Sequence, residues 1–526
     1  MSKPYQSHAL PLILFTIIAF LCFANLGRYP ISILDEAKNT EAAREMLVNQ
    51  SLVPTFNQEL RVDKPPLHYF FMQLGYSIFG VNAFGARFFS AFLGLLLGIF
   101  MFYFTKKHAS KSTAITSLVV LFSSFFWLNE FHLAVPDPYL IFFLSIGWAS
   151  FYNFYKTGKT RDWWLFYGSI GLASLAKGPI AILMTGLIAL LFFLSLKKNF
   201  WKNLTRFQPI WGGIIVLLIA SPWFIYVHQA TGGAFTEGFF IKHNFQRFSS
   251  KMEGHGGTFL LTIVFVFLGL FPLGMFIPQG IFHAYKYYRK DDFITFCGIL
   301  SLTIILFFCI SSTRLPNYTL PAMPFLAILV AAFFKEQIYL KSYARWSFYL
   351  STCIISLVTL AIPAAVIFIF QDEKIPYLSF ILLSVVALVS IFLSWAALHK
   401  HQYQKYIWSI SGGWAVISLI LFWGVFTPLW QMSPVYKAKK IIQSHQVVGV
   451  YQNFDPAFTI QNQRTFPVFQ SLEEIHNFTE VYPQAIFITR DRNISSDSLE
   501  RSGFEFLMNE KSLFENYSSL IFKKIF

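Results

Sequence analysis

The chain has 526 residues, of which 55% are hydrophobic and only 13% are charged. Its 64 phenylalanines and mean hydropathy of +0.53 exclude an ordinary soluble enzyme, in which about a quarter of the residues carry charge. Lys and Arg total 41 against 26 for Asp and Glu, and in so apolar a chain this excess indicates membrane topology rather than nucleic-acid binding. The four cysteines have no metal-ligand spacing. The composition therefore predicts an α-helical polytopic membrane protein.

Thirteen apolar runs are candidates for membrane-spanning helices, because a hydrocarbon core of about 30 Å needs roughly 20 residues of helix. In chain order they cover about residues 9–26, 84–104, 113–131, 138–155, 163–176, 179–196, 209–227, 259–282, 293–311, 318–334, 347–370, 376–398 and 406–427. Only Lys177-Gly178-Pro179 separates the fifth run from the sixth. These two runs are alternatively one broken helix, which would reverse the side of every later loop.

The distribution of positive charge favours thirteen separate spans. Clusters of Lys and Arg follow each even-numbered run, beginning with Lys106 and Lys107 after the second run and ending with Lys400 and Lys405 after the twelfth. Loops rich in Lys and Arg stay in the cytoplasm. This alternation predicts a cytoplasmic N-terminus and a C-terminus outside, with the basic loops anchored at membrane lipids.

Three long segments are predicted on the outer side, at 27–83, 229–258 and after residue 430. The first contains a short amphipathic pattern from Leu34 to Leu47, typical of an interfacial helix. The tail alternates helical and extended patterns, which predicts a small α/β domain. Its helices are expected near 434–442, 472–478 and 496–501, and its strands near 446–451, 485–489 and 519–522. We expect a membrane domain over 1–430 and a tail domain over 431–526.

Basic side chains gather at the predicted outer ends of the spans, where a membrane protein places charges that act on a ligand. Lys64, Lys177, Arg247 and Arg314 are candidates to hold the phosphate oxygens of a phosphorylated lipid. Arginines make forked contacts with phosphate, and lysines act as point charges. The alternative for Lys64 is a simple anchor whose ammonium reaches the lipid headgroups.

Acidic and histidine side chains occupy the same predicted face. Asp35 and Asp137 are candidates to orient or deprotonate an acceptor, or to stabilise positive charge on a sugar ring. Their alternatives are a solvated helix start for Asp35 and a helix cap for Asp137. Asp63 with His243 or His255 is a candidate site for a divalent cation such as Zn, Mn or Mg. A histidine in a polar loop is alternatively only solvated.

Six short motifs occur in an order that resembles a known family. They are Leu34-Asp35-Glu36, Asp63-Lys64-Pro65-Pro66-Leu67, Pro136-Asp137, Ala176-Lys177-Gly178-Pro179, Asn244-Phe245-Gln246-Arg247-Phe248 and Leu315-Pro316-Asn317-Tyr318-Thr319-Leu320-Pro321. Together they look like the bacterial lipid A aminoarabinose transferases and the wider polyprenyl-phosphate sugar glycosyltransferases related to protein mannosyltransferases. The resemblance covers roughly residues 10–430, and the tail also fits the aminoarabinose transferase plan.

The resemblance implies a GT-C fold in the bacterial inner membrane, with its active site at the periplasmic face. It implies a sugar donor linked to undecaprenyl phosphate and transfer with inversion at the anomeric carbon. Asp35 and Asp137 would be the acidic residues of the cavity. The residues expected to approach a donor or acceptor phosphate are Lys64, Lys177, Arg247 and Tyr318. The reaction would need no nucleotide and no redox cofactor.

The acceptor stays open at this point. Lipid A phosphate is the first choice, because the tail and the overall resemblance favour it, and a hydroxyl of a protein or another glycan is the alternative. A flippase or secondary transporter for lipid-linked sugars is a rival from another class. A transporter places ionisable residues near mid-span, whereas here they crowd one rim, which favours the enzyme. A third hypothesis is a non-catalytic envelope assembly protein.

Overall fold

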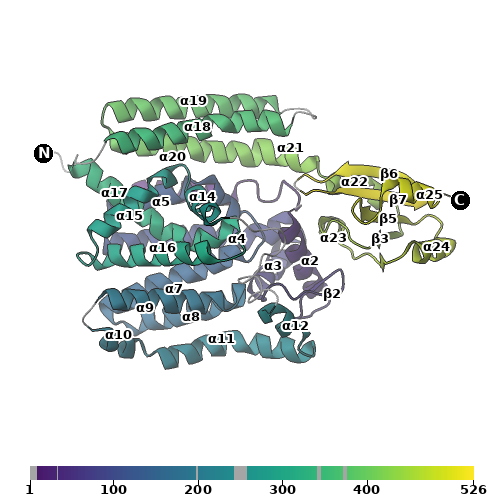
Figure 1. The fold of residues 1–526 in the computed structure, drawn as a ribbon, viewed down its shortest axis with the longest axis horizontal. Helices are drawn as coiled ribbons and strands as arrows, with labels where there is room; N and C mark the ends of the chain where they lie inside the picture. Colours follow the sequence, from purple (N-terminus) through teal and green to yellow (C-terminus); the bar gives the residue numbers. More distant parts are fainter. Residues whose placement is uncertain are drawn as a thin grey trace. The chain divides into compact units, whose positions relative to one another are not determined.

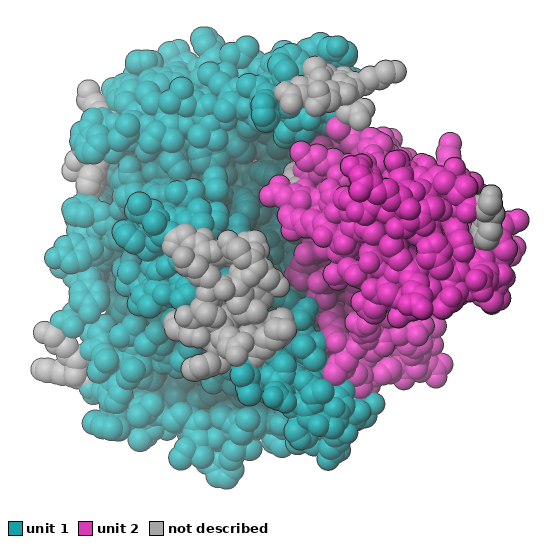
Figure 2. All heavy atoms as spheres, turned by 45° about the vertical axis from the view of Figure 1, so that its right-hand side comes forward, with its two compact units in different colours: residues 1–24, 62–68, 89–422 teal, residues 25–61, 69–88, 423–526 magenta. Residues whose placement is uncertain are grey.

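The computed structural model describes residues 9–31, 33–196, 199–241, 258–340, 345–370, 376–513 and 515–525. The chain forms two compact units, coloured separately in Figure 2. Unit 1 comprises 1–24, 62–68 and 89–422, and unit 2 comprises 25–61, 69–88 and 423–526. Unit 2 therefore combines the tail with most of the first long outer segment. A membrane domain that ends at residue 430 stays a prediction.

Unit 1 is built from apolar helices, many of which run alongside one another in Figure 1. Its first half contains α1 (Ala9–Phe23), α5 (Lys111–Phe122), α6 (Phe125–Phe131), α7 (Asp137–Thr157), α8 (Thr160–Lys177), α9 (Ile180–Ser195), α10 (Phe200–Phe207), α11 (Pro209–Ala230) and α12 (Ala234–Glu237). Its second half contains α14 (Phe259–Gly269), η2 (Leu273–Phe276), α15 (Ile277–Lys286), α16 (Asp292–Ile310), η3 (Pro316–Ala322), α17 (Met323–Leu340), α18 (Arg345–Ile369), α19 (Tyr377–His399) and α20 (Tyr403–Ile420). The long helix α4 (Ala83–His108) begins in unit 2 and continues in unit 1.

Each of the thirteen predicted apolar runs contains helix. Among the described residues, seven helices are long and apolar enough to cross a membrane, or nine if each of two bent pairs is one span. The pairs are α5 with α6, bent by 77°, and α14 with the segment Leu273–Lys286, bent by 115°. The other runs lie in the shorter apolar helices α1 and α9 and in α7 and α8. The multi-pass α-helical fold is confirmed, and the number of thirteen crossings stays a prediction.

The tail forms the small α/β domain that the sequence predicts (Figure 1). Its five-stranded sheet has the order β4-β3-β5-β7-β6, in which β3 pairs parallel with β4 and β5, while β7 pairs antiparallel with β5 and β6. The strands are β3 (Val448–Tyr451), β4 (Val468–Phe469), β5 (Ile486–Arg490), β6 (Phe504–Lys511) and β7 (Ser518–Lys524). The helices are α21 (Phe426–Gln431), α22 (Pro434–Gln443), α23 (Ala457–Asn462), α24 (Leu472–Val481) and α25 (Ser496–Arg501), and the π-helical turn η4 (Leu421–Val425) leads into them. The sequence did not reveal β4, β6 or α23.

The predicted interfacial helix is present as α2 (Leu34–Val48), but its surface is not amphipathic. Glu36, Glu41, Arg44 and Glu45 are buried together with its apolar residues. Buried charged groups need an opposite charge or hydrogen-bond donors. Glu36 pairs with Arg87 and Glu41 with Arg44, while Glu45 accepts hydrogen bonds from the Thr55 hydroxyl and the Gln58 N–H. The pattern of alternating apolar and charged residues therefore predicted the helix correctly and its exposed charged face wrongly.

One of these pairs joins α2 to the start of α4 within unit 2. Both side chains of the Glu36–Arg87 pair are fully buried, and Arg87 Nε and Nη2 donate to the two carboxylate oxygens at 2.7 and 2.8 Å. Arg87 Nη1 also donates to the carbonyls of Leu26 and Tyr29. Because a buried ion pair is stabilising only when its remaining donors are also satisfied, this arrangement holds α2 in a defined position.

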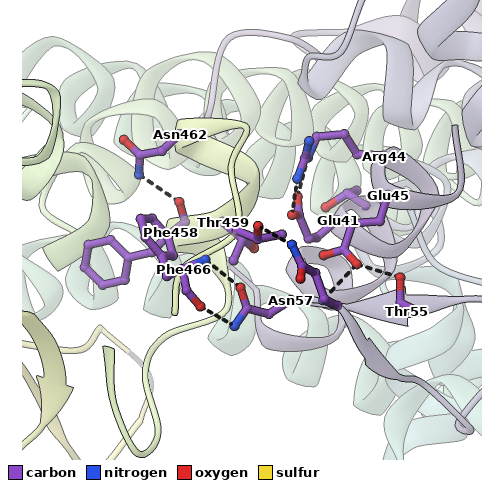
Figure 3. Close-up of polar contacts among 12 residues, drawn as sticks. Glu41, Arg44, Glu45, Thr55, Asn57, Phe458, Thr459, Asn462 and Phe466 are labelled. Carbon is purple, nitrogen blue, oxygen red and sulfur yellow. Dashed lines mark hydrogen bonds and ion pairs between the residues drawn. The ribbon is translucent and has the colours of Figure 1, made fainter. Parts of the chain in front are cut away.

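The first outer segment is also attached to the tail within unit 2 (Figure 3). It contains the hairpin β1 (Thr55–Phe56) and β2 (Glu59–Leu60), followed by α3 (Leu67–Phe79). At the turn of the hairpin, Asn57 Nδ2 donates to the Phe466 carbonyl at 2.9 Å, and the Phe466 N–H donates to Asn57 Oδ1 at 2.8 Å. The Thr55 hydroxyl donates to Glu45 on α2 at 2.6 Å. These bonds connect α2, the hairpin and the segment after α23.

Figure 3 also shows the ion pair of Glu41 with Arg44, at 2.6 Å. Burial raises the pKa of Glu41 from 4.5 to about 6, despite the opposing contribution of Arg44. The proton is bound more tightly in the folded state, so this contribution to stability is complete below pH 4.5 and is lost as the pH rises through 6. The shift corresponds to about 2 kcal/mol.

We therefore expect Glu41→Gln to flatten the part of the pH dependence of thermal stability that lies between pH 4.5 and 6. Intrinsic-fluorescence unfolding of the detergent-solubilised protein at several pH values measures this. The control is Glu59→Gln, because Glu59 is exposed on β2. Parallel pH profiles for the wild type and the Glu41 variant would contradict the assignment.

Candidate active site

One cavity in unit 1 brings together five of the predicted site residues. It has a volume of about 920 Å³, and its polar lining includes Lys64, Asp137, Lys177 and Tyr318. Asp63, predicted as a metal ligand, also lines it. The rest of the lining is mostly apolar and comes from α7, α9 and α16.

Local sequence explains how Asp137 and Lys177 reach this cavity. Pro136 and Pro138 flank Asp137 at the start of α7, where a carboxylate also interacts favourably with the helix dipole. Lys177 is the last residue of α8. Gly178 follows with φ of +79°, a conformation that glycine adopts readily and that reverses the chain into α9.

The two side chains form an ion pair. Lys177 Nζ donates to Asp137 Oδ1 at 2.5 Å, and the side chains are 18% and 5% exposed. Lys177 Nζ also lies 5.1 Å from the ring centroid of Tyr318, at cation–π distance. Asp137 therefore holds the ammonium of Lys177 in a fixed place at the polar part of the cavity.

The cavity is amphipathic along α7. Leu140, Leu144 and Trp148 line it and follow Asp137 at spacings that place them on one face of the helix. Eleven residues of helix separate Asp137 from Trp148, which is about 16 Å. The polar end of the cavity, at Asp137 and Lys177, is thus followed by an apolar wall. This is the shape and polarity that a lipid with a phosphate head requires.

Asp35 belongs to unit 2 and lies in the first turn of α2. Its side chain is 48% exposed, and one carboxylate oxygen lies 3.4 Å from Arg61 Nη2. Arg61 is almost buried and also donates to Asn39 Oδ1 at 2.9 Å and to the Tyr69 hydroxyl at 3.0 Å. No role was predicted for Arg61, although it lies three residues before Lys64.

Arg314 is not among the residues that line the cavity. Its Nη2 donates to the Cys309 carbonyl at 3.1 Å, so part of the guanidinium binds the end of α16. Asn317 and Ser311, which the sequence did not single out, do line the cavity. The sequence signal that could have pointed to Asn317 was its position between Pro316 and Tyr318, inside one of the six motifs.

Three predicted residues, His243, Arg247 and His255, lie outside the described residues. Within the described ranges, no group of three or more His, Cys, Asp or Glu side chains is placed to hold a metal ion. Asp63 is the predicted ligand that the structure describes, and a single carboxylate beside Lys64 does not by itself make a metal centre. A divalent cation at this position stays a prediction.

Comparison with known proteins matches this architecture to membrane glycosyltransferases. Residues 11–234 match the model of the dolichyl-phosphate-mannose-protein mannosyltransferase family. The ArnT protein of Cupriavidus metallidurans, solved with bound undecaprenyl phosphate, has the same fold, with a TM-score of 0.77 over 98% of both chains at 19% identity. An oligosaccharyltransferase of Archaeoglobus fulgidus aligns with a TM-score of 0.51 over 92% of this chain and 70% of that chain, at 12% identity. The fold is therefore that of the GT-C class.

Two sequence relatives extend this result. An uncharacterized protein of Aquifex aeolicus is 30% identical over 369 residues, which is 70% of this chain and 71% of that protein. The undecaprenyl phosphate-alpha-4-amino-4-deoxy-L-arabinose arabinosyl transferase 2 of Pseudomonas fluorescens is 26% identical over 340 residues, 63% of this chain and 61% of the relative. The chain belongs to the family of polyprenyl-phosphate-dependent glycosyltransferases that includes the protein mannosyltransferases and the aminoarabinose transferases.

Proposed function

We propose that this protein transfers a sugar, with inversion, from an undecaprenyl-phosphate-linked donor to a phosphate of lipid A. The observation that carries the proposal is the amphipathic cavity of unit 1, in which Lys64 and the Asp137–Lys177 pair adjoin a long apolar wall. The relatives named as undecaprenyl phosphate-aminoarabinose arabinosyl transferases support the donor class. The family model of the protein mannosyltransferases supports a polyprenyl-phosphate sugar in general.

In the proposed reaction, the bond between the anomeric carbon and the phosphate oxygen of the donor breaks, and an acceptor oxygen bonds to the opposite face of the sugar. Undecaprenyl phosphate leaves with the bonding electron pair. Lys64 and Lys177 offset the negative charge that develops on the leaving phosphate, which is the electrostatic contribution expected to be largest in such a site. Asp137 acts as a positioning residue for Lys177.

The acceptor decides what Asp35 must do. A lipid A phosphate is already ionised near neutral pH, so Asp35 needs only to orient it. A hydroxyl acceptor must lose a proton, so Asp35 would then be the general base. Because Lys177 binds the Asp137 carboxylate in an ion pair, Asp137 is the weaker candidate for this role.

A second candidate function is transfer to a hydroxyl of a protein, which the match of residues 11–234 to the mannosyltransferase model favours. A transporter is disfavoured, because the charged residues of the cavity lie at the ends of α7 and α8 rather than at mid-span. We also propose that the N-terminus is cytoplasmic and the tail periplasmic in the bacterial inner membrane. Labelling of single cysteines placed in the tail of intact cells with a membrane-impermeant reagent tests this orientation.

The deciding experiment compares envelope components from cells with and without the active protein by mass spectrometry. A sugar mass added to lipid A supports the first function, and one added to protein supports the second. Purified protein with an undecaprenyl-phosphate aminosugar and lipid A then reconstitutes the reaction. No transfer to either acceptor, with the wild-type protein correctly inserted, would contradict both proposals.

We expect Lys64→Ala to weaken binding of the donor, because Lys64 lines the cavity and its ammonium would contact the phosphate in the proposed complex. The KM for the donor should rise about tenfold, the effect of losing one charge-assisted contact. Steady-state kinetics with varied donor measures this. Lys202→Ala is the control, because Lys202 is exposed on α10. An unchanged KM would return Lys64 to the role of a lipid anchor.

A further inference from the structure

A second cavity of unit 1 lies at the opposite ends of the helices that form the active-site cavity. It has a volume of about 1110 Å³, and its lining includes Trp163, Trp164, Trp211, Arg206, Gln208 and Thr160. The active-site cavity takes Asp137 from the start of α7 and Lys177 from the end of α8, whereas this one takes residues from the end of α7 and the start of α8. It plays no part in the proposed transfer.

The length of α7 gives the separation of the two cavities. The helix has 21 residues from Asp137 to Thr157, which is about 30 Å and equals the thickness of the hydrocarbon core. The second cavity therefore lies near the opposite membrane surface. Tryptophans are typical of this level, because the indole ring is apolar and its N–H is polar.

The surface around the cavity has the polarity of a lipid–water boundary. Trp211 and Ile210 on α11 are 64% and 80% exposed, and the outer surface of α11 continues as apolar side chains such as Leu217, at 60%. Preceding them, α10 presents the exposed Trp201 and Arg206, while its Phe207 is buried. The second cavity thus adjoins the apolar face of α11 on one side and the cation Arg206 of α10 on the other.

Arg206 is held at the rim of this cavity by specific contacts. Its Nη1 donates to the Tyr155 carbonyl at 3.2 Å, and its guanidinium lies 5.4 Å from the ring centroid of Phe154. Gly158, with φ of +67°, leaves the necessary space, because a Cβ there would fall 2.2 Å from Arg206 Nη2. Among the described residues, no carboxylate forms an ion pair with Arg206.

The helix that carries Arg206 is also fixed at its end. The indole N–H of Trp163 and the hydroxyl of Tyr167 both donate to the Phe207 carbonyl, at 2.8 and 3.0 Å. Gln208 follows in a left-handed conformation and lines the cavity. The cation, the amide of Gln208 and the hydroxyl of Thr160 are therefore presented together beside the three tryptophans.

We propose that this cavity binds an anionic diacyl phospholipid of the leaflet opposite the active site. The phosphate would lie at Arg206, with Gln208 and Thr160 as further hydrogen-bond partners, and an acyl chain would follow Trp211 and Ile214 along α11. Charge complementarity selects this occupant, because the exposed Lys159, Arg161 and Lys202 add positive charge near the same surface. The proposal does not depend on the sugar or acceptor of the transfer reaction.

The test is native mass spectrometry of the purified full-length protein titrated with phosphatidylglycerol or with phosphatidylcholine of the same acyl chains. We expect tighter binding of phosphatidylglycerol. Arg206→Gln should reduce this binding about tenfold and leave phosphatidylcholine unchanged, because one charge-assisted contact to phosphate is lost. Trp211→Ala should weaken both lipids.

Arg289→Gln is the matched control, since it removes the same charge from an exposed position after α15 that does not line the cavity. Arg206→Lys keeps the charge and should retain most of the preference, which separates loss of charge from loss of packing. Equal binding of the two lipids by the wild type would overturn the proposal. So would an unchanged preference in the Arg206→Gln protein, or displacement of phosphatidylglycerol by equimolar undecaprenyl phosphate.

Discussion

Replacing Asp35 by Asn is expected to lower sugar transfer by at least about 100-fold, the usual effect of losing a positioned acid–base or orienting carboxylate. Thermal stability and membrane insertion should be unchanged, because the Asp35 side chain is 48% exposed and its contact with Arg61 is long, at 3.4 Å. Transfer is measured with purified protein at saturating donor and acceptor, so that the change appears in kcat.

The control for this variant is Glu59→Gln, which neutralises an exposed carboxylate of the same outer segment. It should transfer sugar at the wild-type rate. Near-wild-type activity of the Asp35→Asn protein would remove Asp35 from the chemistry and leave it a solvated residue at a helix start.

Lys177→Met is expected to lower transfer by about 100- to 1000-fold, because it removes a fixed cation from the place where charge develops on the leaving phosphate. The same change at Lys159, at the other end of α8 and exposed, should have no effect. Single-turnover transfer from a labelled donor measures the loss directly.

A structural effect must be separated from this chemical one, since Lys177→Met leaves the buried Asp137 carboxylate without the ammonium that it binds. The double variant Asp137→Asn, Lys177→Met removes both charges and should regain stability. If the ammonium contacts phosphate, the double variant is stable and remains inactive. Recovery of activity in the double variant would show that Lys177 only neutralises Asp137.

Much of the site could be predicted from sequence because its residues lie at the ends of helices. The alternation of basic loops placed Asp137 and Lys177 at the same membrane face, and the cavity of unit 1 brings them together. Side-chain contacts could not be predicted in the same way. The ion pair of Lys177 with Asp137 and the contact of Arg314 with the Cys309 carbonyl depend on helix packing between residues far apart or on local chain reversal.

The sequence alone determined the apolar helices, the tail strands β3, β5 and β7 and the class of protein, because hydropathy, charge alternation and turn residues act over short distances along the chain. Tertiary structure decided the 77° and 115° bends, the burial of α2 and the grouping of the first outer segment with the tail. Each of these depends on partners distant in sequence. Glu36 needs Arg87, and Asn57 needs Phe466, so no local pattern predicts them.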